Sequence, residues 1–484
     1  MEKSLKQQTV TGVFWSAIEQ FGFLGIQFIT TIIIARILTP ADYGLIGLLT
    51  IFTALGMTIT DSGFGQALIQ KKDVTEIDYS TVFYTNLVLG LIIYFILYLC
   101  SPLIANFFHT PELEKISKWV FLVFPINSIG IIQYTIITKN VNFKALTKIS
   151  VISSIISGIF GISLAYNGMG VWALVYQNIL YYFLKSILLW YYNHWKPSLN
   201  FSFKSFKNLF GFSSNLLGTS MIIILFNNLY TVLIGRFYAI NEVGYYNQAY
   251  RFENIPASTL TTIIQRVSYP ILSTIQNDNE RLKSGYRKII NQAVFFNFPL
   301  MIGLIVIGHN LFDVLLTAKW LPAVPYFQLL CVYGALFPLQ SINVNILKVK
   351  GKGGTLLKLE ILRRIIMILV ILITIKHGII VLLIGNIFTS VLSISINMYV
   401  CGKEINLKIL EQIHDIIPYL LASIISSGAM FLIDLLIQPV NLIFALIIQI
   451  IIGAIIYLAL SEILKLRAYL EIKEIIKMKK NEKK

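Results

Sequence analysis

The sequence alternates between long apolar segments and short polar ones, and this alternation constrains the fold more than any other feature. A helix needs about 20 mainly apolar residues to cross a bilayer core. The composition agrees, because 56% of the residues are hydrophobic and 13% are charged, against roughly 25% charged in soluble domains. We therefore predict an all-α integral membrane protein with about 14 transmembrane helices, and we exclude a soluble enzyme and a disordered chain. The predicted spans lie near 10–34, 43–63, 79–104, 116–138, 147–167, 170–192, 211–235, 243–270, 287–309, 322–346, 356–376, 378–400, 414–437 and 440–462.

Positive charge is distributed unevenly over the segments between these spans. If both termini are cytoplasmic, 28 of the 39 Lys and Arg residues fall in inside segments and six in outside ones. Lys and Arg accumulate in cytoplasmic loops of membrane proteins. The pattern predicts cytoplasmic termini, with the first helix retained instead of cleaved as a signal peptide. It also accounts for the net charge of +16 without a nucleic-acid partner.

The sequence contains an internal repeat at an offset of 200 residues. Arg36 corresponds to Arg236, Asp42 to Glu242 and Gly44 to Gly244. Such repeats, with both halves in the same orientation, are typical of transporters that work by alternating access. We predict an N-terminal lobe over 1–192, an amphipathic cytoplasmic linker over 193–208, a C-terminal lobe over 209–402, two further helices over 403–464 and a basic cytoplasmic tail over 465–484.

Two segments carry a resemblance to a known family. ARILTPADYGLIGL (35–48) and GRFYAINEVGYYNQAYR (235–251) resemble the Wzx-type oligosaccharide flippases of the multidrug/oligosaccharidyl-lipid/polysaccharide exporter superfamily. The resemblance implies a V-shaped pair of lobes in the bacterial inner membrane. It also implies transfer of undecaprenyl-pyrophosphate-linked oligosaccharide to the outer leaflet, for O-antigen, capsule or exopolysaccharide synthesis.

Related lipid II flippases suggest where such a substrate would bind. In them, the two extra helices form a groove for the lipid tail, and arginines in the cavity hold the pyrophosphate. Here the interior of the first helix offers Glu19 and Gln27 but no arginine. The pyrophosphate ligands therefore cannot be matched one by one.

Charged residues inside the spans are candidates for the site, because a charge at the bilayer centre costs about 2.5–3.5 kcal/mol and usually faces a cavity or a partner. Glu19 is either a cavity carboxylate or part of a contact that joins helices. Arg251 is the first candidate for a pyrophosphate contact, because guanidinium binds phosphate oxygens in a bidentate way. Its alternative is an ion pair with Glu19.

The remaining cavity candidates are less specific. Lys185 is either a cavity cation or a side chain that reaches the surface. Arg363 is a candidate for contacts with anionic headgroups or the substrate phosphate, while Glu360 and Arg364 stand at the i, i+4 spacing of a local ion pair. Asp61 closes the second span, where a helix-ending role is expected. Further candidates that suit a polar cavity are Glu253, Gln27, Asn228 and Asn247.

No catalytic, metal or cofactor site is predicted. The sequence lacks the GxxxxGK[ST] motif of ATP-binding loops, so transport is expected to use an H⁺ or Na⁺ gradient or the membrane potential. The expected partners are the lipid-linked oligosaccharide, membrane lipids, and the polysaccharide polymerase and assembly proteins, with the chain itself a monomer. The alternatives are an ion-coupled multidrug exporter of the same superfamily and a polytopic polysaccharide polymerase or transferase.

Overall fold

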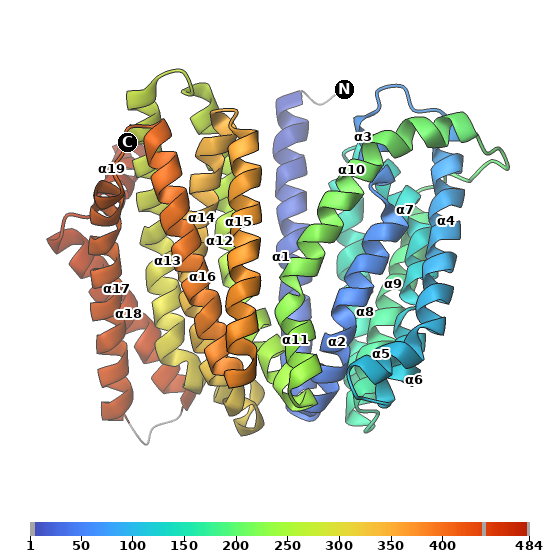
Figure 1. The fold of residues 1–484 in the computed structure, drawn as a ribbon, viewed down its shortest axis with the longest axis horizontal. Coiled ribbons are helices and arrows are strands. Elements are labelled where there is room, and N and C mark those ends of the chain that lie inside the picture. The colour runs from blue at the N-terminus through green and yellow to red at the C-terminus, as the bar shows by residue number, and fades with distance from the viewer. Residues whose placement is uncertain (1–4, 438–441, 482–484) are drawn as a thin grey trace. The chain divides into compact units, whose positions relative to one another are not determined.

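The computed structural model describes residues 5–437 and 442–481, which form helices and short connections without a strand (Figure 1). Contacts divide the chain into unit 1, Met1–Gly244, and unit 2, Tyr245–Lys484. Both units are helical throughout their described residues, as the apolar segments predict.

Each predicted span coincides with a helical segment, but not every one is apolar enough to be assigned to the membrane by composition. Among the described residues, ten helical segments are long and apolar enough to cross a bilayer, or eleven if the bent pair Phe203–Gly211 and Leu216–Asn227 is one span. The helices Val171–Tyr192, Ile240–Thr274 and Gly353–Thr374 are long enough but more polar. The number fourteen therefore stays a prediction.

Unit 1 is built from helices that pack lengthwise on their neighbours. Helix α1 lies along α8, α8 along α9, and α7 along both α4 and α9. The turn before α2 is stabilised by a capping box. The Thr39 side chain accepts a hydrogen bond from the Asp42 N–H, and the Thr39 N–H donates to the Asp42 carboxylate. Pro40 follows as the first residue of the helix. The helices are α1 Leu5–Ile37, α2 Pro40–Asp61, α3 Phe64–Gln70, α4 Glu76–Leu99, α5 Ser101–Phe107, α6 Glu112–Val120, α7 Val123–Lys139, α8 Phe143–Tyr166, α9 Val171–Tyr192, α10 Phe203–Asn227 and α11 Leu229–Phe237, followed by the start of α12, Ile240–Thr274.

The repeat glycines meet where the first turns of α2 and α12 cross. A Cβ atom on Gly44 would collide with the backbone oxygen of Ile240, and one on Gly244 would collide with the backbone of Pro40. Pro40 and Ile240 are themselves 200 residues apart, so the contact is reciprocal: each half offers the same glycine to the same position of the other. Only a residue without a side chain allows two helix backbones to approach this closely.

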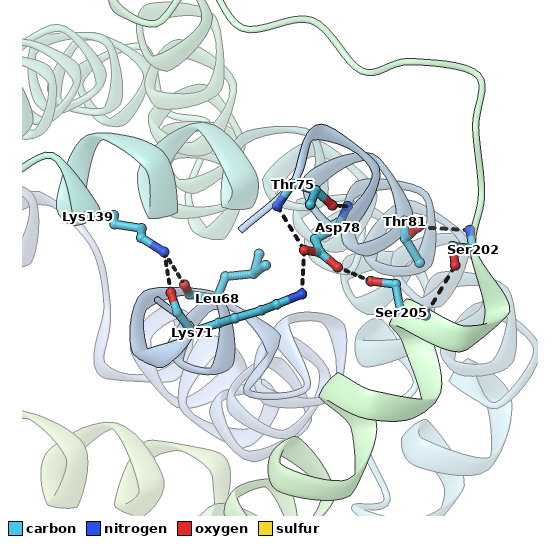
Figure 2. A network of polar contacts seen from close by, with 8 residues as sticks. All are labelled: Leu68, Lys71, Thr75, Asp78, Thr81, Lys139, Ser202 and Ser205. Atoms are coloured by element: carbon cyan, nitrogen blue, oxygen red, sulfur yellow. Dashed lines mark hydrogen bonds and ion pairs between the residues drawn. The ribbon is translucent and has the colours of Figure 1, made fainter. Parts of the chain in front are cut away.

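The predicted linker is fastened to unit 1 by its first ten residues and by the start of α10. Figure 2 shows Asp78, at the start of α4, accepting hydrogen bonds from Lys71 at 2.6 Å, from the Thr75 N–H at 2.9 Å and from Ser205. The Ser202 N–H donates to Thr81 at 3.0 Å. Since the Asp78 side chain is 4% exposed, these bonds hold a buried carboxylate at the junction.

Aromatic side chains add an apolar contact at the same junction. The Phe206 ring lies 5.8 Å from the Phe64 ring of α3, and Phe210 stacks on Phe206 at 5.4 Å. The Trp195 indole N–H donates to Glu76 at 2.5 Å. Trp195 and Phe206 are half-buried, whereas Phe201, Phe203 and Phe210 are exposed, so the amphipathic surface linker stays a prediction.

Unit 2 has its core between α13, α14, α16 and α17, with α18 and α19 against α13. An ion pair joins α13 to α17: Arg287 donates to both carboxylate oxygens of Asp415, at 2.6 and 2.5 Å. At α19, a hydrogen bond to Glu462 raises the pKa of Lys473. After the rest of α12, the elements are α13 Asn279–Leu316, the 3₁₀ turn Ala318–Ala323, α14 Val324–Val349, α15 Gly353–Thr374, the 3₁₀ turn Ile375–His377, α16 Ile379–Glu404, α17 Ile409–Ile437, α18 Leu442–Ile463 and α19 Arg467–Asn481.

The predicted lobe boundaries are not tested by this division. By contacts, α10 and α11 belong to unit 1, where α10 packs on α2, α3 and α4. The sequence repeat, in which α10 and α11 match α1, predicts that they belong to the C-terminal lobe.

Candidate functional site

Unit 1 contains a polar cavity of about 730 Å³ between α2, α3, α7, α9 and α10. Two charged side chains line it, Asp61 and Lys185. Amide, hydroxyl and phenol groups complete the polar part of the wall, and aliphatic side chains of α10 close one side. The polar lining residues include Thr58, Gln66, Asn127, Tyr134, Thr135, Tyr182 and Ser220.

Lys185 is held at the cavity wall by two tyrosines. Its ammonium lies 5.3 Å from the ring centre of Tyr134 and 5.9 Å from that of Tyr181. Cation–π contacts of this kind hold a cation without neutralising its charge. The structure places Lys185 among the residues that line this cavity.

Glu19, on α1, is not among the residues that line the cavity. It accepts a hydrogen bond from Ser150 of α8 at 3.0 Å and interacts electrostatically with Lys185. In the part of the chain that the structure describes, Glu19 and Lys185 do not form an ion pair. The structure thus brings two predicted site residues together, with Glu19 in the helix-joining contact that was one of its alternatives.

Asp61 lines the cavity, whereas the sequence predicts a helix-ending role for it. It does end α2, where Ser62 and Gly63 adopt left-handed conformations with φ of 49° and 71°. It also accepts a hydrogen bond from the Gly65 N–H, which directs its carboxylate toward the cavity that it lines. The spacing of Asp and Gly in TDSGFG thus produces both the turn and the placement of the carboxylate.

In unit 2, Glu253 is buried against the backbone of α14. It is 2% exposed, and its carboxylate occupies the space where Gly334 has no side chain. Nearby, Tyr333 hydrogen bonds with Arg363 of α15 and interacts electrostatically with Glu253. Arg363 and Glu360 are 3.7 Å apart. These residues form a second polar cluster, which α12, α14 and α15 supply.

The predicted local ion pair of α15 is present, with Arg364 and Glu360 3.9 Å apart. The other predicted site residues are dispersed. Gln27 is half-buried on α1, Arg251 and Asn247 are half-buried on α12, and Asn228 lies between α10 and α11, where its amide donates to the Ile224 carbonyl at 2.9 Å.

Unit 2 also has an apolar groove of about 430 Å³ between α13, α17 and α18. Its lining runs along α13 from Phe295 to Ile307 and includes Met430 of α17 and Tyr457 of α18. Helices α17 and α18 lie outside the repeat. A hydrocarbon chain is the natural occupant of such a lining, because the groove offers it almost no polar group.

Sequence reasoning missed the tyrosines Tyr134 and Tyr182 and the amides Gln66 and Asn127 as parts of one cavity. Tyrosine and amide side chains are common in membrane spans, where amides also form hydrogen bonds between helices. The signal that could have found the cavity is the spacing of Asp61 from Gly63 and Gly65. The described residues contain no group of three or more His, Cys, Asp or Glu side chains suited to a metal ion.

The fold is shared with a solved transporter. The structure of the lipid II flippase MurJ in its inward closed conformation aligns with 93% of this chain and 98% of its own, with a TM-score of 0.72 and 18% sequence identity. At that identity the likeness shows the fold alone. The molecule is therefore a multi-pass membrane protein with the helical architecture of that transporter.

Sequence comparison identifies the family. Residues 33–325 match the polysaccharide biosynthesis protein family, and the chain belongs to it. It is 29% identical to the teichuronic acid biosynthesis protein TuaB of Bacillus subtilis over 72% of this chain and 73% of that protein. It is 28% identical to the lipopolysaccharide biosynthesis protein WzxC of Escherichia coli over 75% of each chain.

Proposed function

We propose that the protein is a flippase, which moves an undecaprenyl-pyrophosphate-linked oligosaccharide from the cytoplasmic to the outer leaflet of the bacterial inner membrane by alternating access. The observation that carries this proposal is the pairing of two environments in one chain. A polar cavity contains Lys185 among tyrosines and amides, and a separate apolar groove follows α13. The family and the flippase fold support it.

Each environment suits one part of such a substrate. The Lys185 ammonium can hold a phosphate oxygen, since hydrogen bonds between charged groups are the strong ones. Tyr134 and Tyr182 present aromatic faces for sugar rings, and Gln66 and Asn127 can bond their hydroxyl groups. The groove along α13 matches the hydrocarbon chain. Arg251 and Arg363 remain further candidates for the pyrophosphate.

The driving force that we propose is the membrane potential, with an ion gradient as the alternative. An inside-negative potential favours outward movement of an anion by about 2.3 kcal/mol per charge per 100 mV. A pyrophosphate carrier moves with its negative charges, so the potential alone would favour export. On this proposal the protein breaks no covalent bond, which separates it from a polymerase or transferase.

The test is flipping of a fluorescent undecaprenyl-pyrophosphate oligosaccharide in proteoliposomes, with and without an imposed potential. We expect transport by the wild type, faster with the potential inside-negative. Lys185→Gln should reduce the initial rate by about tenfold or more, because it removes a charge-assisted contact worth about 1.5–3 kcal/mol. Lys358→Gln, at an exposed site on α15, is the matched control and should leave the rate unchanged.

Other results would contradict the proposal. If no lipid-linked oligosaccharide is moved, but a cationic dye is exported with a proton or sodium gradient, the protein is a multidrug exporter. The carboxylate of Asp61 in the cavity would then be the residue to pursue. Equal transport by Lys185→Gln and wild type would remove the cavity of unit 1 from the substrate path and leave Arg251→Gln and Arg363→Gln to be tested.

A further inference from the structure

A second polar pocket, of about 480 Å³, lies in unit 2 where the start of α13 meets α19. It is separate from the apolar groove and from the polar cluster of α12, α14 and α15. Its lining is mostly charged, from Glu280, Lys283, Arg287, Lys288, Arg467 and Glu471. These residues belong to the segments that the charge distribution predicts to be cytoplasmic.

Two of the cations already have partners. Arg287 is held by both oxygens of Asp415, and Lys288 lies 3.2 Å from Glu471. Glu471 also accepts a hydrogen bond from Gln292 at 3.2 Å. These pairs fix the wall of the pocket.

The remaining polar groups of the pocket can still form hydrogen bonds or ion pairs with an occupant. Lys283 donates one hydrogen bond, to the Asn406 carbonyl at 3.0 Å, and has further donors to offer. Within the part of the chain that the structure describes, Arg467 and Glu280 form no ion pair. Asn291 is 4% exposed, and among the described residues nothing donates to its side-chain oxygen. An unmet buried acceptor costs about 1–3 kcal/mol, so an occupant that donates to it would be favoured.

We propose that this pocket binds the headgroup of a membrane glycerophospholipid that carries both a phosphate and hydrogen-bond donors. The phosphodiester meets Arg467 and Lys283, while the ammonium or hydroxyl donors of the headgroup meet Glu280 and the Asn291 oxygen. Basic pockets among helices at the cytoplasmic surface are suited to phospholipid headgroups. Phosphatidylethanolamine and phosphatidylglycerol have this chemistry, whereas phosphatidylcholine has the phosphate but no donor.

The position of the pocket on α13 suits a lipid. Asn291 of the pocket and Phe295 of the apolar groove are four residues apart, so they lie on one face of the helix. The Phe295 ring, which lines the groove, lies 5.4 Å from that of Tyr457 on α18 and 6.4 Å from that of Tyr469 on α19. A lipid whose headgroup occupies the pocket therefore reaches apolar side chains within one helical turn, and its chains would share this groove with the hydrocarbon chain of the proposed substrate.

The experiment is native mass spectrometry of the purified full-length protein, titrated separately with phosphatidylethanolamine, phosphatidylglycerol, phosphatidylcholine and undecaprenyl pyrophosphate. We expect one copy of phosphatidylethanolamine or phosphatidylglycerol to be retained about tenfold more tightly than phosphatidylcholine, as one or two charge-assisted hydrogen bonds require. The double variant Lys283→Gln/Arg467→Gln should lose this preference, and Asn291→Leu should weaken it. Lys477→Gln, exposed on the same α19, is the matched control.

Three outcomes would overturn the proposal. The first is equal retention of all three phospholipids by the wild type. The second is a preference that survives the double variant. The third is tightest retention of undecaprenyl pyrophosphate with loss in the same variant, which would make the pocket a docking point for a transport substrate. Unchanged thermal melting of the double variant Lys283→Gln/Arg467→Gln shows that loss of binding is not loss of folding. Because lipid retention is measured without transport, a negative result here would not contradict the proposed flippase activity, and the reverse also holds.

Discussion

At Gly334 the absence of a side chain determines where a buried carboxylate lies. Glu253 fills the space that a Cβ atom would need, and it is 2% exposed. Burying a polar group is costly unless hydrogen bonds compensate. The close approach of α12 and α14 at this point therefore depends on one glycine, which places Glu253 next to Tyr333.

We predict that Gly334→Ala destabilises the protein by about 1–3 kcal/mol, the usual cost of overpacking. The new methyl group must push the Glu253 carboxylate away from the α14 backbone. The measurement is thermal unfolding of purified protein in detergent. Glu253→Ala should relieve the clash, so the double variant Gly334→Ala/Glu253→Ala should be more stable than the sum of the single changes implies.

The control for this substitution is Gly428→Ala. Gly428 lies within α17 and has no atom close enough to meet an added Cβ. Alanine is favoured over glycine in a helix by about 1 kcal/mol, so this variant should be as stable as the wild type or more so. If Gly334→Ala melts like Gly428→Ala, the packing of Glu253 against α14 is not tight.

At residue scale the sequence identifies which side chains are unusual but not where they point. Glu19 and Lys185 stand out because charge is rare inside an apolar span, and the structure places both near one cavity. Asp61 was assigned to a helix end because it closes an apolar run. Its second role depends on the turn at Gly63, which the Asp–Gly spacing indicates, and on the packing of α7, which no local pattern reveals.

Among the elements, the junction of α4 with the segment before α10 depends on Asp78. We predict that Asp78→Ala loosens residues 193–205 from their Ser205 end, because it removes the acceptor for Ser205 together with that for the neighbouring Lys71 and Thr75. Leaving a buried donor without its acceptor costs about 1–3 kcal/mol, while Lys71, whose side chain is 38% exposed, can be solvated. Hydrogen–deuterium exchange of residues 193–205 should rise by about tenfold or more.

Asp73→Asn is the matched control for this experiment, because Asp73 is exposed in the loop before α4. Its exchange pattern should match that of the wild type. Protection of residues 193–205 that survives in Asp78→Ala would mean that the hydrogen bonds of Ser198 and Ser202 and the aromatic contacts hold the segment without the carboxylate.

Helix α9, Val171–Tyr192, tests whether the polar helices span the membrane. We predict that it does, so its two ends should lie on opposite sides. In a cysteine-free background, Asn167→Cys should react with a membrane-impermeant maleimide from outside, and Lys196→Cys only from the cytoplasmic side, as should the control Lys72→Cys. Reaction of both ends from one side would reduce the number of spans and reverse the orientation of everything after them.

The positions of the helices could be predicted from the sequence, because apolar length determines a membrane span. What could not be predicted is how each helix begins, bends and packs. The short helix α11 falls mostly within the seventh predicted span, because the break at Asn228 lies inside an apolar run, and α3 lies outside every predicted span. The apolar groove requires α13, α17 and α18 together, and a contact between distant helices leaves no periodic signal in any one of them.

At the scale of the whole molecule, the internal repeat appears as a physical contact. Gly44 packs on Ile240, and Gly244 packs on Pro40. We predict that Gly44→Ala and Gly244→Ala each lower the melting temperature, while the double variant loses less than the two shifts together, because both changes open one crossing. Gly25→Ala, with open space around its Cβ position, should melt like the wild type. Fully additive shifts would mean that the two glycines do not share a contact.

The two repeats make the same contact with each other, as the subunits of a symmetric dimer do. In a symmetric dimer, residue i of one copy meets residue j of the other, and j meets i. A polypeptide half as long, with a proline and a glycine at the places of Pro40 and Gly44, would make the same contact with a second copy of itself. Gene duplication and fusion would then join two such subunits without changing the contact. On this view the paired glycines preserve the interface of an ancestral homodimer, and complementation by two separately expressed halves is a way to rebuild it.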